Sequence, residues 1–239
     1  MTALILQGRL DSSRLPGKSL CSLGGEALLF RVMEALDRVP CDLRILACPE
    51  DCEASFLPLA RRAGFELVTG PKDDVLGRFC AAMRRFRPDR VIRATGDNPF
   101  VFADAAAALA GEAAALDADY AGYRGLPYGA GVEALKAAAL FRAEQEAAEP
   151  FEREHVCPYL YKHPERFRVH RPFAPETWLD PLLAENRVTR LSVDTAEDLE
   201  TADALYAALT EEYGGGDKRF FGENIIRAYL ERFSHAKSS

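Results

Sequence analysis

Long apolar runs, paired cysteines and an excess of basic residues are all missing from this sequence of 239 residues. No apolar stretch approaches the roughly 20 residues that a membrane-spanning helix needs. The apolar stretch at the N-terminus ends at Gln7, which is too short for a secretory signal, and its basic residue follows it instead of preceding it. These absences predict a soluble protein of the cytoplasm, without a membrane partner.

The six cysteines stand apart, with no C-x-x-C pair and no His/Cys spacing typical of a zinc finger. We therefore expect reduced, mostly buried cysteines in a reducing compartment. The formal net charge of −7 excludes a broad basic surface for nucleic acid or for an anionic membrane. Any anion that binds this protein must meet a local cluster of basic residues.

Apolar patterning indicates strands that alternate with helices over the first half of the chain. Short apolar runs predict strands, and longer stretches with apolar residues at helical spacing predict helices. The expected strands span 3–7, 43–48, 65–69 and 91–94, and the expected helices span 26–38, 51–63, 74–87 and 105–118. Strands joined by helices of this length form βαβ units. The sequence thus predicts an α/β fold, with a mostly parallel sheet and helices on both faces.

The pattern changes after about Tyr120. Residues 120–185 hold five of the eight tyrosines and many of the prolines, with only short helical and extended pieces between them. A strand is expected again over 188–193, followed by helices over about 196–209 and 222–233. One domain, 1–239, is therefore predicted, with 120–185 as an inserted segment. Because its aromatic content exceeds what a small insertion buries alone, we expect a homodimer through this segment.

Basic residues gather in the loop that follows the first expected strand. Residues 8–19 carry Arg9, Arg14 and Lys18 against a single acid, together with glycines and serine hydroxyls. Such a loop suits a polyphosphate, and a solvated basic loop is the alternative. A P-loop is disfavoured, because Ser12 stands where that motif has its first glycine.

Two aspartates follow expected strands in the same way. Asp97 comes after 91–94, and Asp194 comes after 188–193. Because ligands bind beyond the carboxyl ends of strands in open α/β sheets, the two carboxylates are expected to meet above one sheet edge. A pair of carboxylates with a triphosphate suits Mg²⁺. Each aspartate also has a structural alternative, a turn before Pro99 for the first and a helix N-cap for the second.

Residues 4–20, LILQGRLDSSRLPGKSL, resemble the signature that opens the cytidylyltransferases of the spore coat polysaccharide biosynthesis type. That family is related to the CMP-Kdo and acylneuraminate cytidylyltransferases. Further blocks follow in the order that the family shows, at 74–79, 93–99, 153–156 and 193–199. The five ordered blocks cover about residues 3–205, and together they are far more specific than any one of them.

The resemblance implies a Rossmann-like fold of the glycosyltransferase A type. It also implies an enzyme that moves CMP from CTP to a sugar or sugar acid, releasing pyrophosphate, for a surface polysaccharide or glycan. The residues that would contact the nucleotide are Gln7, Gly8, Arg9, Ser13, Arg14, Lys18, Asp74, Arg78 and Asp97. Of the catalytic residues Arg14, Lys18, Asp97 and Asp194, the two aspartates would hold Mg²⁺. Residues on the acceptor side would be Glu133, Arg153 and His155.

The chain departs from the family pattern at three positions. Gly8 stands where these enzymes usually have Ala, which fits a close backbone approach, and Asn98 replaces the usual Cys. Gly131 occupies a position that is often acidic, so we expect an unusual acceptor. Two other functions stay open. One is a different nucleotide-sugar enzyme of this fold, with another base, an alcohol-phosphate acceptor or glycosyl transfer. The other is a non-catalytic nucleotide-binding protein.

Overall fold

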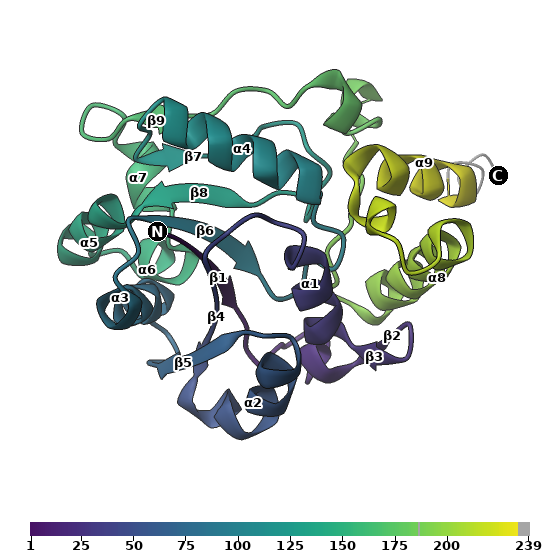
Figure 1. Ribbon diagram of the computed structural model, residues 1–239, viewed down its shortest axis with the longest axis horizontal. Helices are drawn as coiled ribbons and strands as arrows, with labels where there is room; N and C mark the ends of the chain where they lie inside the picture. Colours follow the sequence, from purple (N-terminus) through teal and green to yellow (C-terminus); the bar gives the residue numbers. More distant parts are fainter. Residues whose placement is uncertain (186, 234–239) are drawn as a thin grey trace.

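A seven-stranded sheet lies at the centre of the computed structural model, which describes residues 1–185 and 187–233 (Figure 1). The strands are β1 (Thr2–Gln7), β4 (Leu43–Pro49), β5 (Glu66–Gly70), β6 (Arg90–Thr95), β7 (Tyr120–Ala121), β8 (Glu133–Lys136) and β9 (Val169–His170). Their order is β5-β4-β1-β6-β8-β7-β9. The first four in that order are parallel neighbours, β8 is antiparallel to β6 and β7, and β9 is parallel to β7. The predicted α/β fold with a mostly parallel sheet is confirmed.

The apolar run of β1 fills both faces of the sheet, because successive side chains of a strand point to opposite sides. Leu4 and Leu6 join a core shared with residues of α1, α2 and α4, while Ala3 and Ile5 join a core shared with α3, α5 and α7. These helices span Leu28–Leu36 (α1), Glu53–Arg62 (α2), Val75–Phe86 (α3), Ala103–Ala115 (α4), Ala137–Glu146 (α5) and Pro158–Lys162 (α7). Burial of both faces is the usual condition of a parallel sheet.

The expected helices of the first half are confirmed, with ends that shift by a few residues. The helix expected from residue 26 begins at Leu28, because β3 (Glu26–Ala27) pairs instead with β2 (Ser22–Leu23). The helix expected from residue 51 begins with a 3-10 turn, η2 (Glu50–Cys52). A short hairpin therefore precedes α1, where the helical spacing of apolar residues suggested one continuous helix.

Residues 120–185 extend the main sheet and do not form a separate body. They supply β7, β8 and β9, the helices α5, α6 (Pro150–His155) and α7, and two 3-10 turns, η3 (Glu176–Trp178) and η4 (Leu183–Glu185). In the antiparallel register of β6 and β8, Glu133 lies opposite Arg93. The expected insertion is thus built into the sheet, beside its parallel half. Of the expected domain 1–239, residues 234–239 lie outside the described residues.

The strand expected over 188–193 is wrong. This segment crosses the strand ends instead of joining the sheet, and its backbone bonds go to loops: Leu191 N–H donates to Tyr128 O at 2.8 Å, and Val193 N–H donates to Asp97 O at 2.8 Å. The alternation of apolar residues that suggested a strand comes from burial of Leu191 and Val193 against the last two helices. Apolar residues that alternate along the chain indicate only that one side of the segment is buried. A loop that packs on a core shows the same alternation as a strand.

Two helices at the C-terminal end confirm the expectation for this region. They are α8 (Ala196–Tyr213) and α9 (Gly222–Phe233), joined through Gly214 and a 3-10 turn, η5 (Asp217–Phe220). They pack together on a third core, which includes Leu205 of α8 and Ile225 of α9, at the side of the molecule where α1 lies (Figure 1). In the described part of the chain, no helix is both long and apolar enough to span a membrane.

Candidate active site

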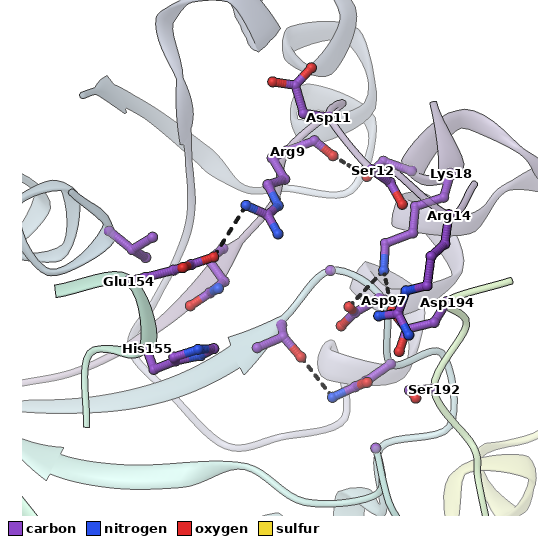
Figure 2. Close-up of a pocket in the computed structure, with 18 of the residues that line it drawn as sticks. Arg9, Asp11, Ser12, Arg14, Lys18, Asp97, Glu154, His155, Ser192 and Asp194 are labelled. Carbon is purple, nitrogen blue, oxygen red and sulfur yellow. Dashed lines mark hydrogen bonds and ion pairs between the residues drawn. The ribbon is translucent and has the colours of Figure 1, made fainter. Parts of the chain in front are cut away.

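A cavity of about 450 Å³ opens beyond the carboxyl ends of β1 and β6. The predicted site residues that line it are Gln7, Gly8, Arg9, Ser13, Arg14, Lys18, Arg78, Asp97, His155 and Asp194. Asp74, Glu133 and Arg153 are not part of the lining. The cavity therefore gathers the basic loop and both aspartates at the sheet edge, as Figure 2 shows.

The basic loop is held in shape by its own backbone and by two serines, of which Ser12 Oγ accepts from Leu15 N–H at 3.3 Å. Ser19 Oγ donates to Arg9 O at 2.7 Å, and Gly17 N–H donates to Leu10 O at 3.2 Å. Gly17 has φ +67°, a conformation that costs a glycine little, and it starts the 3-10 turn η1 (Lys18–Leu20). These contacts fix the main chain at Lys18, so that its side chain reaches into the cavity.

Lys18 lies between two aspartates, Asp97 after β6 and Asp194 after the segment 188–193 (Figure 2). Its Nζ donates to Asp97 Oδ2 at 2.9 Å, to Asp194 Oδ1 at 3.0 Å and to Val193 O at 3.0 Å. Arg14 reaches the same Asp194 oxygen at 3.2 Å. The two carboxylates therefore converge, although they come from positions nearly a hundred residues apart.

Asp194 is free to face the cavity because its neighbour caps the helix. Thr195 is the N-cap of α8, and it forms a capping box with Asp198. Burial raises the pKa of the Asp194 carboxyl, but the hydrogen bond from Lys18 and the surrounding basic charges outweigh burial and hold the pKa below its ordinary value. Asp194 therefore stays ionised at neutral pH, and the N-cap alternative for it does not hold.

The two carboxylates suit a metal ion, because they already share one cation. Oxygens that contact the same ammonium nitrogen lie within about 6 Å of each other, so a divalent ion in that place would receive one oxygen from each. The described residues contain no group of three or more His, Cys, Asp or Glu side chains that could hold a metal. The other ligands of such an ion would thus be phosphate oxygens and water, which is the usual environment of Mg²⁺.

Gln7 is oriented by a partly buried ion pair at the wall of the cavity, where Arg93 is part of the lining. Arg93 pairs with Glu133, and Arg93 Nε donates to Gln7 Oε1 at 3.1 Å. Tyr120 Oη donates to the other Glu133 oxygen at 2.9 Å. Because arginine has no acceptor, the amide oxygen of Gln7 must face Arg93, and the amide NH₂ remains to face the cavity. Gln7 thus presents a donor to the cavity, whereas Glu133, predicted on the acceptor side, contacts Arg93 and is not part of the lining.

The three predicted residues Asp74, Arg78 and Arg153 make contacts that hold the fold together. Asp74 accepts from Gly77 N–H at 2.9 Å as the N-cap of α3, and its other oxygen accepts from Arg153 Nη2 at 2.6 Å. Arg78 is 2% exposed and donates to backbone carbonyls of the loop before α3. The pair of Asp74 and Arg153 ties α6 to α3, so nucleotide and acceptor roles for these two side chains are not supported by their positions.

Gly8 packs against core side chains beneath the loop. A Cβ at this residue would meet Phe56 at 3.3 Å, Leu46 at 3.4 Å and Leu29 at 3.5 Å, all of them core side chains. A methyl group here would therefore need only a small shift of Phe56, which agrees with the Ala of the related enzymes, and packing alone does not require glycine. At Gly131 a Cβ would meet only Leu126, at 3.1 Å, so this position keeps the cavity wall open.

Arg9 and His155 face one another across the far end of the cavity, and Glu154 lies between their segments (Figure 2). Arg9 Nη1 contacts Glu154 Oε1 at 3.4 Å, with both side chains about half exposed. His155 stacks on Phe151, with ring centroids 4.3 Å apart. Of the two α6 residues predicted on the acceptor side, Arg153 and His155, only His155 is part of the lining.

Several residues that line the cavity were not predicted from the sequence, among them Tyr128, Gly129 and Ser192. Gly129 has φ +94°, and a Cβ there would lie 2.7 Å from Ser192 N, so only glycine allows these two loops to meet. Arg190 stacks on Tyr128 at 4.6 Å and donates to Asp194 Oδ2 at 3.1 Å. Ser192 lies two residues before Asp194, and that proximity was the one signal available in the sequence.

Comparisons with known proteins agree with this geometry. A family model described as cytidylyltransferase matches residues 3–226. The spore coat polysaccharide biosynthesis protein SpsF of Bacillus subtilis (strain 168) is 32% identical over 209 residues, which cover 84% of this chain and 85% of that protein.

Solved structures show the same fold. A cytidylyltransferase from Leptospira borgpetersenii serovar Hardjo-bovis has a TM-score of 0.85 at 21% identity, covering 100% of this chain and 97% of its own. CMP:2-keto-3-deoxy-manno-octonic acid synthetase, solved with CTP, has a TM-score of 0.64 at 17% identity, covering 86% and 98%. Because the family model matches nearly the whole length of this chain, the chain belongs to the cytidylyltransferase family and is a nucleotidyltransferase.

Proposed function

We propose that this enzyme transfers CMP from CTP to a hydroxyl of a sugar or sugar acid, with release of pyrophosphate, in the biosynthesis of a surface polysaccharide or glycan. The observation that carries the proposal is the convergence of Lys18, Asp97 and Asp194 beside the basic loop. The basic side chains of the loop can bind the negative charge of a polyphosphate. The two carboxylates beside the loop can bind a metal cation that accompanies it. The spore coat relative supports the polysaccharide context.

The reaction is an in-line displacement at the α-phosphorus. The acceptor oxygen forms a bond to phosphorus, the bond to the bridging oxygen of pyrophosphate breaks, and the acceptor proton passes to solvent. Such reactions depend mainly on positioning and on neutralising charge. Arg9, Ser13 and Arg14 bind the triphosphate, and Arg14 can hold two phosphate oxygens at once through its planar guanidinium. Lys18 acts as a movable point charge on the leaving pyrophosphate.

Mg²⁺ is the proposed cofactor, held by Asp97 and Asp194. When bound, it supplies positive charge that polarises the α-phosphate and orients it for attack. The acceptor lies on the side of His155, Tyr128 and the open wall at Gly131. The proposed place of action is the cytoplasm, and a homodimer through 120–185 stays a prediction.

CTP is expected to bind in preference to UTP, ATP and GTP. The fixed amide NH₂ of Gln7 supports a pyrimidine with ring acceptors, because N3 of cytosine accepts a hydrogen bond where N3 of uracil donates one. Thermal unfolding with Mg²⁺ and each nucleotide at equal concentration measures the preference, since a ligand that binds more tightly stabilises the folded state more. A larger stabilisation by a purine nucleotide would contradict it.

A screen of nucleotide and acceptor pairs for pyrophosphate release tests the reaction itself. Pyrophosphate in the presence of CTP and a sugar-type acceptor is the expected product. Release of free nucleotide from an added nucleotide-sugar donor, with no pyrophosphate from CTP, would instead indicate glycosyl transfer. Nucleotide binding without any turnover would indicate a non-catalytic protein.

His155→Ala is expected to raise the KM of the acceptor several-fold while leaving the KM of CTP nearly unchanged. His155 lines the far end of the cavity, away from Lys18 and the two aspartates (Figure 2). His163→Ala is the matched control, because His163 pairs with Glu165 outside the lining. Steady-state kinetics with each substrate varied in turn measures both constants. An unchanged acceptor KM and kcat in His155→Ala would remove this residue from the acceptor site.

A further inference from the structure

The ammonium of Lys18 is held as a bound cation would be. Its side chain is 11% exposed, and lysine is seldom this buried unless it is paired. An ammonium has three N–H donors, and the structure gives it three acceptors within 3.0 Å: one oxygen from each aspartate and Val193 O. Every donor is used, so no donor of Lys18 is left for a phosphate in this arrangement.

The cage around the ammonium is built independently of Lys18. Val193 N–H donates to Asp97 O at 2.8 Å, which ties the two carboxylate-bearing segments together through their backbones. The capping box at Thr195 fixes the chain directly after Asp194. Removal of the lysine side chain therefore leaves two carboxylates and a carbonyl that still face one point. Oxygen ligands of this kind suit a hard divalent cation.

Lys18 and a metal ion cannot share this point. With both present, two cations would stand a few ångströms apart in a partly buried place, where repulsion is weakly screened. Lys18 can leave only if it finds another anion. Free metal brings none, whereas a nucleoside triphosphate brings several phosphate oxygens to the loop that carries Lys18, Arg9 and Arg14.

We propose that Lys18 occupies the metal position of the nucleotide-free enzyme, and that it excludes free divalent metal until the metal arrives together with CTP. The inference rests on the proposed function, because it takes the two aspartates as metal ligands. Binding of the triphosphate moves the ammonium from the carboxylates to phosphate and opens the position in the same step. Asp97 is thereby neutralised in both states, once by the lysine and once by the metal, while Asp194 also pairs with Arg14 and Arg190.

Titration of the nucleotide-free protein with Mn²⁺ tests this, with the EPR signal of unbound Mn²⁺ as the readout. Lys18→Met keeps most of the side-chain volume and removes the charge, and it is expected to bind Mn²⁺ at least about tenfold more tightly than the original protein. Asp97→Asn in the Lys18→Met background is expected to abolish the gain. Lys72→Met is the matched control, because Lys72 also pairs with a carboxylate, Asp11, but is exposed. Its Mn²⁺ affinity is expected to be unchanged.

Thermal unfolding gives a second readout. Mn²⁺ without nucleotide is expected to raise the Tm of Lys18→Met more than that of the original protein, since a ligand of the folded state stabilises it. If Lys18→Met does not fold, Lys18→Gln keeps two donors for the carboxylates and serves in the same titration. Equal Mn²⁺ affinities of the original protein and the folded variant would overturn the proposal.

The titration needs no turnover, so its failure is distinguishable from failure of the proposed function. A gain in Mn²⁺ affinity without any pyrophosphate release from CTP would remove the proposed reaction and leave the role of Lys18 standing. Pyrophosphate release without a gain in Mn²⁺ affinity would do the reverse. With a non-hydrolysable CTP analogue, the original protein is also expected to gain Mn²⁺ affinity by a larger factor than Lys18→Met does.

Discussion

Asp97→Asn is expected to lower kcat by at least about a hundredfold, ~2.7 kcal/mol of transition-state stabilisation, with little effect on folding. Asparagine keeps the volume of the side chain and removes the charge that now faces Lys18 at 2.9 Å. Without this carboxylate, the proposed metal position keeps one charged ligand instead of two. Folding should be preserved, because Lys18 retains Asp194 and Val193 O as partners.

The kinetic loss has to be separated from any general effect of the substitution. Asp217→Asn makes the same chemical change at an exposed ion pair with Arg38, where little stability and no activity should be lost. Pyrophosphate release under saturating CTP measures kcat, and circular dichroism against temperature measures folding. Activity within tenfold of the original protein would remove Asp97 from the metal site.

Glu133→Ala is expected to destabilise the protein by about 1–3 kcal/mol, because it leaves Arg93 without its carboxylate partner at a partly buried place. The partner is Arg93, whose side chain is 11% exposed and has no other carboxylate in contact among the described residues. Tyr120→Phe is the matched control, since it removes only the hydrogen bond to Glu133 and should cost about 1 kcal/mol. Urea unfolding of the three proteins measures the differences.

This prediction also separates a structural role of Glu133 from the acceptor role that the resemblance implied. A double variant, Arg93→Met with Glu133→Leu, is expected to recover much of the lost stability, because apolar residues of similar volume often replace a buried pair without loss. An acceptor-binding Glu133 would instead leave stability unchanged in Glu133→Ala and raise the KM of the acceptor. That outcome would contradict the assignment made from the structure.

The parallel half of the fold could be predicted from the sequence, because its strands are buried on both faces and read as apolar runs. β1, β4, β5 and β6 each lie within one or two residues of the expected positions. The short strands β7 and β9, two residues each, could not be found, since two residues show no periodicity. Their pairing depends on partners far along the chain.

The basic loop and the two aspartates could also be found, because each stands directly beside a strand end or a helix start. The rest of the site depends on contacts between distant segments. Tyr128 and Arg190 meet through a bridge between their loops and through stacking of their side chains, and nothing near either residue in the sequence signals this contact. Glu133 and Arg153 do not line the cavity, because a matching motif gives the position of a residue along the chain and leaves the direction of its side chain open.

The contact between Lys18 and Asp194 closes a span of 176 residues, and this has a consequence for synthesis on the ribosome. At about 5–20 residues per second, Asp194 is made on the order of ten seconds or more after Lys18. During that interval the loop, β1 and β6 can already pair, but the ammonium has neither its second carboxylate nor Val193 O. A nascent chain that ends before residue 193 therefore exposes an unfinished cavity. We expect nucleotide to stabilise the full site only once Val193 and Asp194 have emerged and closed it.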